Sequence, residues 1–337
     1  MLLSGSSSGV ELLPSKQVVA GSNPVSRSTE RISGMGLVLV GTCSWTDPTL
    51  LESGWYPTGV RTPEQRLQYY ASQFPIVEAD SPYYALPAER TVRLWVERTP
   101  PGFIFNIKAF SLFTRHPTQV RALSRDIREA LPPEARGKAS IYDRDVPEVV
   151  KKDIWKRFED ALLPLDSAGK LALVLFQFPQ WFLPGPEGRE YILACQENLP
   201  QYRLAVEFRN GAWLNEKNRD GTFDFLRENS LVYACVDEPQ GFRSSMPPLA
   251  EATSDIGLIR FHGRNQENWE RKGISVAERF QYLYSGGELE EWGPRVQHLA
   301  SRTEKLHVLF NNCYADYGVK NARDMQALVR ALQLPLE

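Results

Sequence analysis

The stretch Lys170–Phe178 reads KLALVLFQF, and the interpretation of the whole chain starts from it. Its short apolar run is bounded by turn and helix signals, a pattern typical of a buried strand. Helical patterns precede and follow it, at residues 153–163 and 187–197. A strand between two helices is the repeating unit of a parallel sheet.

The same alternation continues in both directions along the chain. Seven further β-rich runs are expected at residues 37–44, 75–80, 103–108, 202–207, 231–237, 257–262 and 305–312. Helical patterns lie between most of them, at residues 62–70, 87–96, 117–131, 222–228, 289–303 and 319–332. Eight strands alternating with helices predict an α/β fold, a TIM-barrel-like (β/α)8 parallel barrel. The rival is an open doubly wound sheet, which favours a Gly-rich turn after its first strand. The segment at 43–48 reads CSWTDP instead.

The chain is expected to hold one barrel domain, residues 37–335, with an insertion near 132–150. Residues 1–36 are rich in Ser and poor in acidic residues. We interpret them as a disordered tail or a mis-called start, with Met35 as the alternative initiator. A transit segment is the other interpretation.

Composition excludes several classes of protein. The 337 residues include 39 Lys+Arg and 41 Asp+Glu, so no bulk charge would hold the chain to nucleic acid or to a membrane. Four widely spaced cysteines argue against a disulfide framework or a thiolate zinc site, and favour a reducing, cytoplasmic location. The sequence has no apolar run long enough to span a membrane.

Polar side chains gather at the carboxyl ends of the predicted strands. Because side chains alternate along a strand, Glu78 shares a face with Asp80, Glu207 with Arg209, and Arg260 with His262. We expect this face to point into the barrel mouth, where barrel enzymes hold their sites. The charged members of the set are Glu78, Asp80, Lys108, Glu207, Arg209, Asp237 and Arg260. The alternative is an ion-pair network that only closes the barrel top.

Several blocks in order resemble one known family. They are GTCSW at 41–45, WYP at 55–57, RLQYYASQFPIVEADSPYYALP at 66–87, FIFNIKA at 103–109, AVEFRNGAW at 205–213, IRFHGR at 259–264 and FNN…GVKNA at 310–322. The order and spacing resemble the domain of unknown function 72 family, also called YecE-like, over about residues 37–332. The resemblance implies a TIM-barrel-like fold and no established reaction. One departure is EADSPYY at 78–84, where the family usually reads EINSTFY, so Asp80 replaces an amide.

Two kinds of chemistry suit the predicted mouth. Glu78 or Glu207 would act as the acid or base, with His262 as a third candidate catalytic residue. Arginine forks suit phosphate and carboxylate groups, so anion binding is the better supported chemistry. The candidate substrate-binding residues are Trp45, Asp80, Tyr84, Lys108, His116, Arg209, Asp237, Arg260, Arg264, Asn311, Asn312 and Asn321. Rim aromatics Trp45, Tyr83, Tyr84, Phe110 and Trp213 would stack on a base or sugar, or else pack the loops.

The sequence favours an enzyme of the hydrolase or isomerase/lyase type. Its substrate would be small and anionic, with a phosphorylated compound as one option, and it would need no organic cofactor. One alternative is a nucleic-acid-processing or nucleic-acid-binding barrel, and another is a non-catalytic binding module. A divalent metal held by Glu78, Asp80 and Asp237 is a weaker alternative. No membrane partner is expected, and the oligomeric state stays open.

Overall fold

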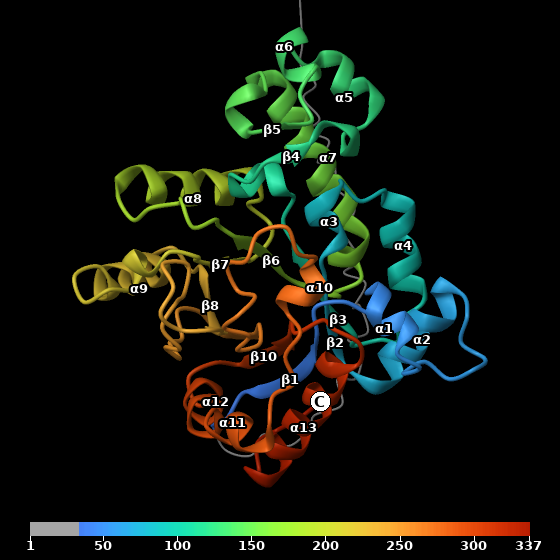
Figure 1. Cartoon of the computed structure of the whole chain (residues 1–337), viewed down its shortest axis with the longest axis vertical. Helices are drawn as coiled ribbons and strands as arrows, with labels where there is room; N and C mark the ends of the chain where they lie inside the picture. The colour runs from blue at the N-terminus through green and yellow to red at the C-terminus, as the bar shows by residue number, and fades with distance from the viewer. Residues whose placement is uncertain (1–33) are drawn as a thin grey trace, which may run out of the picture. The chain divides into compact units, whose positions relative to one another are not determined.

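Eight parallel strands close into a barrel in the computed structural model, which describes residues 34–337 (Figure 1). The strands are β1 Leu37–Thr42, β2 Ile76–Ala79, β3 Ile104–Lys108, β6 Leu171–Gln177, β7 Leu204–Glu207, β8 Val232–Asp237, β9 Ile256–Phe261 and β10 Lys305–Phe310. Their order around the barrel is β1-β10-β9-β8-β7-β6-β3-β2. The predicted (β/α)8 barrel and all eight predicted strands are therefore confirmed. The expectations for the amino-terminal tail fall, up to residue 33, outside the described residues.

Helices connect the strands and cover the outside of the barrel (Figure 1). They are α1 Pro48–Glu52, α2 Pro63–Gln73, α3 Ser81–Tyr84, α4 Glu89–Glu97, α7 Glu148–Ser167, α8 Pro186–Asn198, α9 Arg219–Glu228, α10 Val276–Arg279, α11 Gly286–Glu290, α12 Gly293–Ala300 and α13 Tyr317–Ala331. Local signals set their ends: Thr62 caps α2 in a capping box with Gln65, and Pro63 takes the first helical position. In the described chain, no helix is both long enough and apolar enough to cross a membrane.

The prediction of one continuous helix over residues 289–303 is wrong. The chain instead forms α11 and α12, which are separated around Trp292. Pro294 supplies the physical reason, because it has no backbone N–H to continue the ladder of α11 and suits the first turn of a new helix.

The insertion starts earlier than expected and contains a small sheet. Strands β4 (Thr118–Gln119) and β5 (Ser140–Ile141) pair antiparallel, and helices α5 (Arg125–Ala130) and α6 (Pro133–Arg136) lie between them. The helix predicted over 117–131 is therefore wrong in its first half. Short 3-10 turns complete the region and the later loops: η1 Ser111–Thr114, η2 Val120–Ala122, η3 Asp143–Asp145 and η4 Gly211–Trp213. Figure 1 shows this segment, in green, extending away from the barrel.

Two apolar layers lie on opposite sides of the barrel wall. The inner layer includes Leu39, Leu173 and Leu258, while the outer layer includes Val77, Phe105 and Phe261 against the helices. The wall is tight where β1 meets β2, because a Cβ on Gly41 would lie 2.0 Å from the Ile76 carbonyl oxygen. Because side chains alternate along each strand, only every second side chain points into the barrel. The residues on this interior face therefore determine which groups lie at the mouth.

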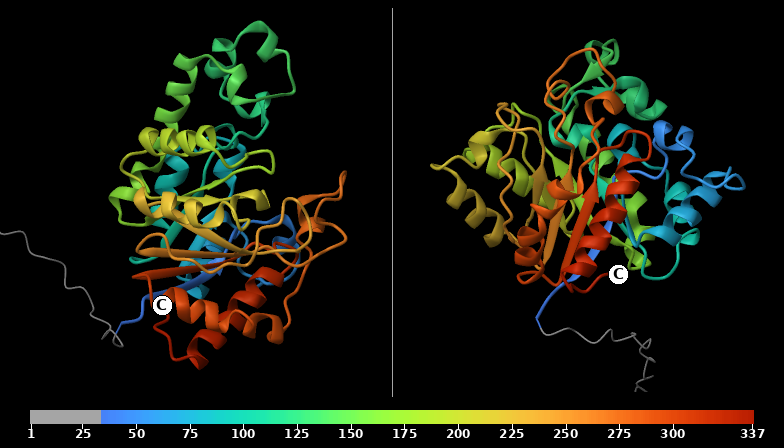
Figure 2. Two further views of the ribbon diagram at one scale, coloured as in Figure 1. Left: turned by 90° about the vertical axis from the view of Figure 1, so that its left-hand side faces the viewer. Right: turned by 60° about the horizontal axis from the view of Figure 1, so that its bottom comes forward.

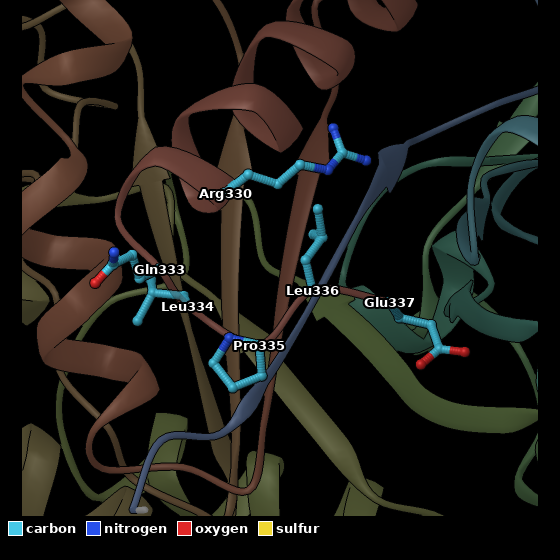
Figure 3. Close-up of a pocket in the computed structure, with 6 residues that line it drawn as sticks. All are labelled: Arg330, Gln333, Leu334, Pro335, Leu336 and Glu337. Atoms are coloured by element: carbon cyan, nitrogen blue, oxygen red, sulfur yellow. The ribbon is translucent and has the colours of Figure 1, made fainter. Parts of the chain in front are cut away.

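The carboxyl-terminal segment pairs with β1 at the amino-terminal end of the barrel. Val38 N–H donates to the Pro335 carbonyl at 2.8 Å, and Glu337 N–H donates to the Val38 carbonyl at 3.1 Å. Figure 3 shows Arg330 and residues 333–337 around a hollow beside β1. The loop after β9, in orange, projects on the side of the barrel away from this terminus (Figure 2, left). The polar residues described next lie at that carboxyl end of the strands.

Candidate functional site

Arg260 lies at the centre of the polar cluster and joins two carboxylates from different strands. Its Nη2 is 2.5 Å from Glu78 Oε1, and its Nη1 contacts Glu207 Oε2. All three side chains are fully buried. Because β2, β7 and β9 each contribute one of them, the ion pairs connect distant parts of the barrel. The guanidinium occupies the space between the two carboxyls, so they cannot flank a glycosidic bond as a glycosidase pair does.

A second arginine extends the network toward the surface. Arg209 Nη2 is 2.6 Å from Glu207 Oε1, and its Nη1 is 2.6 Å from Glu238 Oε2. The other oxygen of Glu238 accepts the Met246 backbone N–H at 2.7 Å. The sequence analysis did not include Glu238, because it followed only the face of β8 that carries Asp237. Strand alternation contained the signal, since the side chain after Asp237 points to the opposite face.

His262 is enclosed and holds other site residues in place. Its Nε2 is 3.2 Å from Glu207 Oε1, and its Nδ1 is 2.9 Å from the Asn311 amide nitrogen. Arg209 Nη2 lies 2.9 Å from the same Nε2, and because a guanidinium can only donate, Nε2 accepts from Arg209. Burial, together with Arg209, lowers the pKa of His262 to about 3, so the ring is neutral. The rings of Trp269 and Phe280 lie over it. The catalytic role of His262 stays a prediction.

The three buried carboxyls differ in their protonation. Burial favours the neutral form of Glu207, but Arg209 and Arg260 outweigh it and hold the pKa of Glu207 well below its usual range. For Glu78, burial prevails over Arg260, and the negative charge of Asp80 adds to it, which raises the pKa to about 7. Burial likewise raises the pKa of Glu238 to about 8. Near neutral pH, Glu207 is ionised and Glu78 is poised between its two forms.

Glu78 and Asp80 form a carboxyl pair. Glu78 Oε2 and Asp80 Oδ1 are both buried, and neither has a hydrogen-bond donor among residues 34–337. The terminal nitrogens of Arg260 donate elsewhere, Nη1 to Glu207 and Gln177 and Nη2 to Glu78 Oε1 and Cys43 Sγ. The negative charge of Asp80 favours the protonated form of Glu78 and adds to the rise in its pKa.

Lys108 and His116 lie near the same opening. The Lys108 ammonium is 4.8 Å from the Tyr83 ring centroid, and within the described residues it forms no ion pair with a carboxylate. His116 lies with its ring edge toward Tyr83, and its Nδ1 is 2.9 Å from Thr114 Oγ1. Burial, then Lys108 and Arg209, lower the pKa of His116 to about 3. The positive charges of Lys108 and Arg209 therefore disfavour protonation of the His116 ring, which is neutral.

Asp237 does not face the mouth, and its predicted place there is wrong. It shares the outward face of β8 with Cys235, which packs in the layer between wall and helices. Its Oδ1 accepts from the Tyr284 hydroxyl at 2.7 Å, and its Oδ2 accepts from Trp292 Nε1 at 2.7 Å. Arg264 binds the same carboxylate at 2.8 Å and is drawn to that side with it. Both residues anchor the loop after β9 to the helices.

Three further predicted residues also lie outside the mouth. Asn312 and Asn321 bind each other at 2.9 Å, and Asn321 binds the backbone of Tyr284. Trp45 packs edge-on against Trp95 with ring centroids 5.6 Å apart, in the outer layer. For Asn312 the physical reason is the strand alternation after β10, which turns its side chain toward the helices. Asn321 instead lies on α13, and Trp45 lies in the loop between β1 and α1.

The predicted aromatic rim is smaller than expected and has a different member. Phe110 and Trp213 are fully buried core residues. Tyr83 and Tyr84 stay at the rim, and Tyr84 is 58% exposed. Trp181, which sequence reasoning missed, lies with its ring centroid 5.8 Å from that of His116. Its position just after β6 was the available signal, because loops that follow strands line the mouth.

The alternative metal site lacks the residues it needs. Asp237 faces away from Glu78 and Asp80, so the proposed set of three carboxylates is not assembled. In the described part of the chain, no group of three or more His, Cys, Asp or Glu side chains could hold a metal ion.

The sequence and fold resemble those of several known proteins. The family model described as "Protein of unknown function DUF72" matches residues 39–336. The UPF0759 protein YunF of Bacillus subtilis is 31% identical over 297 residues, which cover 87% of this chain and 95% of that protein. The crystal structure of a DUF72 family protein from Enterococcus faecalis matches with a TM-score of 0.70 and 25% identity, covering 87% of this chain and 96% of that one. Another from Thermotoga maritima matches with a TM-score of 0.68 and 29% identity, covering 87% and 99%.

Proposed function

The chain belongs to the DUF72 family of proteins of unknown function, and we propose that it is an enzyme that transfers a proton with Glu78 on a small anionic substrate. The substrate binds at the carboxyl end of the barrel, beside Lys108. The reaction is of the hydrolase or isomerase/lyase type and needs no organic cofactor.

The carboxyl pair of Glu78 and Asp80 is the observation that carries the proposal. A buried carboxyl with a pKa of about 7 both gives and takes a proton near neutral pH, which suits a general acid or base. Glu207 is the poorer candidate, because two arginines keep it ionised and occupy its oxygens. The negative charge of Asp80 helps to raise the pKa of Glu78, and its role as a substrate contact stays a prediction.

Lys108 and Arg209 supply the charge that would hold the anion. Lys108 has no carboxylate partner within residues 34–337, whereas Arg209 is 9% exposed and already binds two carboxylates. Arg260 is a poor anion ligand, since it is fully buried and its terminal nitrogens are both used. Arg260 therefore aligns Glu78 and Glu207, and Lys108 is the main anion contact.

Anion binding is tested by calorimetric titration with inorganic phosphate and with sulfate. Lys108→Gln should weaken binding at least tenfold, because it removes the unpaired cation. Lys152→Gln is the matched control, since Lys152 is an exposed lysine on α7. Equal affinity in the wild type and the Lys108→Gln variant would remove the anion site from the proposal.

Proton transfer is tested by incubating the protein with a metabolite extract and following the loss and gain of compounds by mass spectrometry. Glu78→Gln should abolish turnover while leaving phosphate affinity within about threefold. Glu97→Gln, an exposed change on α4, should leave both unchanged. Products whose combined mass exceeds that of the substrate by one water indicate hydrolysis, and a product of unchanged mass indicates isomerisation.

The same experiments separate the alternatives. Phosphate binding without turnover of any compound supports a non-catalytic binding module. Tight binding of single-stranded nucleic acid that weakens steeply as salt is added supports a nucleic-acid barrel instead.

A further inference from the structure

We propose that Trp181 forms a ring-binding subsite beside Lys108, so that the ligand carries its anionic group on a ring whose face stacks on the indole. This inference rests on the proposed function, because it uses the same anion contact. It adds a substrate class, namely phosphorylated compounds with a sugar or nucleobase ring.

Two contacts position the indole of Trp181 while about half of the residue faces solvent. Its Nε1–H donates to the Arg115 carbonyl at 3.3 Å, and the His116 ring meets it at an interplanar angle of 67°. Even so, 51% of the residue is exposed. An indole whose only polar group is already bonded offers an apolar face, which gains free energy when a flat ligand covers it.

The partner of the indole N–H is itself fixed. Arg115 adopts a left-handed backbone conformation with φ of 62°, which is uncommon for a residue other than glycine. Its guanidinium is 3.0 Å from Asp143 and lies 3.7 Å from the Tyr191 ring centroid. These contacts hold the Arg115 carbonyl toward Trp181, so the indole is positioned before any ligand binds.

Aromatic contacts connect the indole to the cation. Trp181 meets His116 at 5.8 Å between centroids, His116 meets Tyr83 at 5.5 Å, and the Lys108 ammonium lies 4.8 Å from the Tyr83 centroid. A series of ring contacts therefore joins the indole to the ammonium near the carboxyl ends of β2, β3 and β6. A ligand with a phosphate on a ring matches that order of groups.

The test compares the affinities of three compounds: inorganic phosphate, a hexose 6-phosphate and a nucleoside 5′-monophosphate. Trp181→Ala should lower the affinity for the ring-bearing compound that occupies the subsite by at least tenfold, as expected for the loss of one stacking platform. The affinity for inorganic phosphate should stay within about twofold. Trp181→Phe should retain most of the ring-dependent affinity. Leu183→Ala is the matched control, since Leu183 is also 51% exposed and lies two residues away.

Each outcome has a distinct meaning. A loss confined to the nucleotide assigns a nucleobase to the subsite, and a loss confined to the hexose phosphate assigns a sugar. Equal affinity of Trp181→Ala and wild type for both ring compounds overturns the subsite but leaves the anion site standing. If Lys108→Gln does not weaken inorganic phosphate, the proposed function fails by itself. Binding of none of the three compounds overturns both.

Discussion

Arg260 and Glu78 form an ion pair inside the barrel, with Nη2 and Oε1 2.5 Å apart and both side chains withdrawn from solvent. The second terminal nitrogen of Arg260 contacts Glu207, so one guanidinium binds carboxylates from two strands. Removing a buried charge from such a pair leaves its partner uncompensated, and this is costly even where the intact pair adds little net stability.

Arg260→Met should therefore lower the free energy of unfolding by about 3–5 kcal/mol at pH 7, measured by denaturant titration. Arg125→Ala, which breaks an exposed ion pair with Glu129, should cost about 1 kcal/mol or less. If the two variants unfold at similar denaturant concentrations, the buried network does not have the role described here.

Asp80→Asn should lower the pKa of Glu78 from about 7, because the neighbouring negative charge is lost. The protonated carboxyl of Glu78 is followed by infrared titration, as the difference between each protein and its Glu78→Gln counterpart. The apparent pKa should move to lower pH in the Asp80→Asn variant. An unchanged titration midpoint would mean that the two carboxyls do not interact.

His307→Leu should reduce the loss of stability in acid. His307 is buried in β10 with no partner for either ring nitrogen in the described chain, and burial lowers its pKa from 6.5 to about 3. Between these values the unfolded chain binds the extra proton, so stability falls as the pH falls. The variant should lose about 1.4 kcal/mol less per pH unit than the wild type in this range.

Denaturant unfolding at several pH values between 6.5 and 4 provides the measurement. His298→Gln is the control, since His298 is exposed on α12. Parallel stability curves for His307→Leu and the wild type would contradict the burial of an uncharged His307.

Asp237→Asn should destabilise the protein without affecting the mouth. The new amide hydrogens would face the donors of Tyr284, Trp292 or Arg264, so a buried donor loses its acceptor, at a cost of about 1–3 kcal/mol. Phosphate affinity should stay within about twofold of the wild type. A large loss of affinity in calorimetric titration, with little change in unfolding, would return Asp237 to the binding site.

Much of the site could be predicted from sequence because strand alternation is a local property. Glu78, Glu207 and Arg260 follow apolar residues on their own strands, so their shared interior face could be counted directly. Asp237 and Glu238 show the limit of this reasoning. They are adjacent and acidic at the end of β8, and only the orientation of the strand distinguishes the outward residue from the inward one.

The sequence by itself predicted the barrel, since eight apolar runs separated by helical patterns, with no Gly-rich turn after the first, favour a closed parallel sheet over an open one. Only the tertiary structure decided which charges neutralise one another. The partners of Arg260 come from residues 53 and 182 positions away, and such pairing depends on register and strand order. Local patterns select the face on which a side chain lies, whereas the electrostatic state of that side chain depends on every element that meets it.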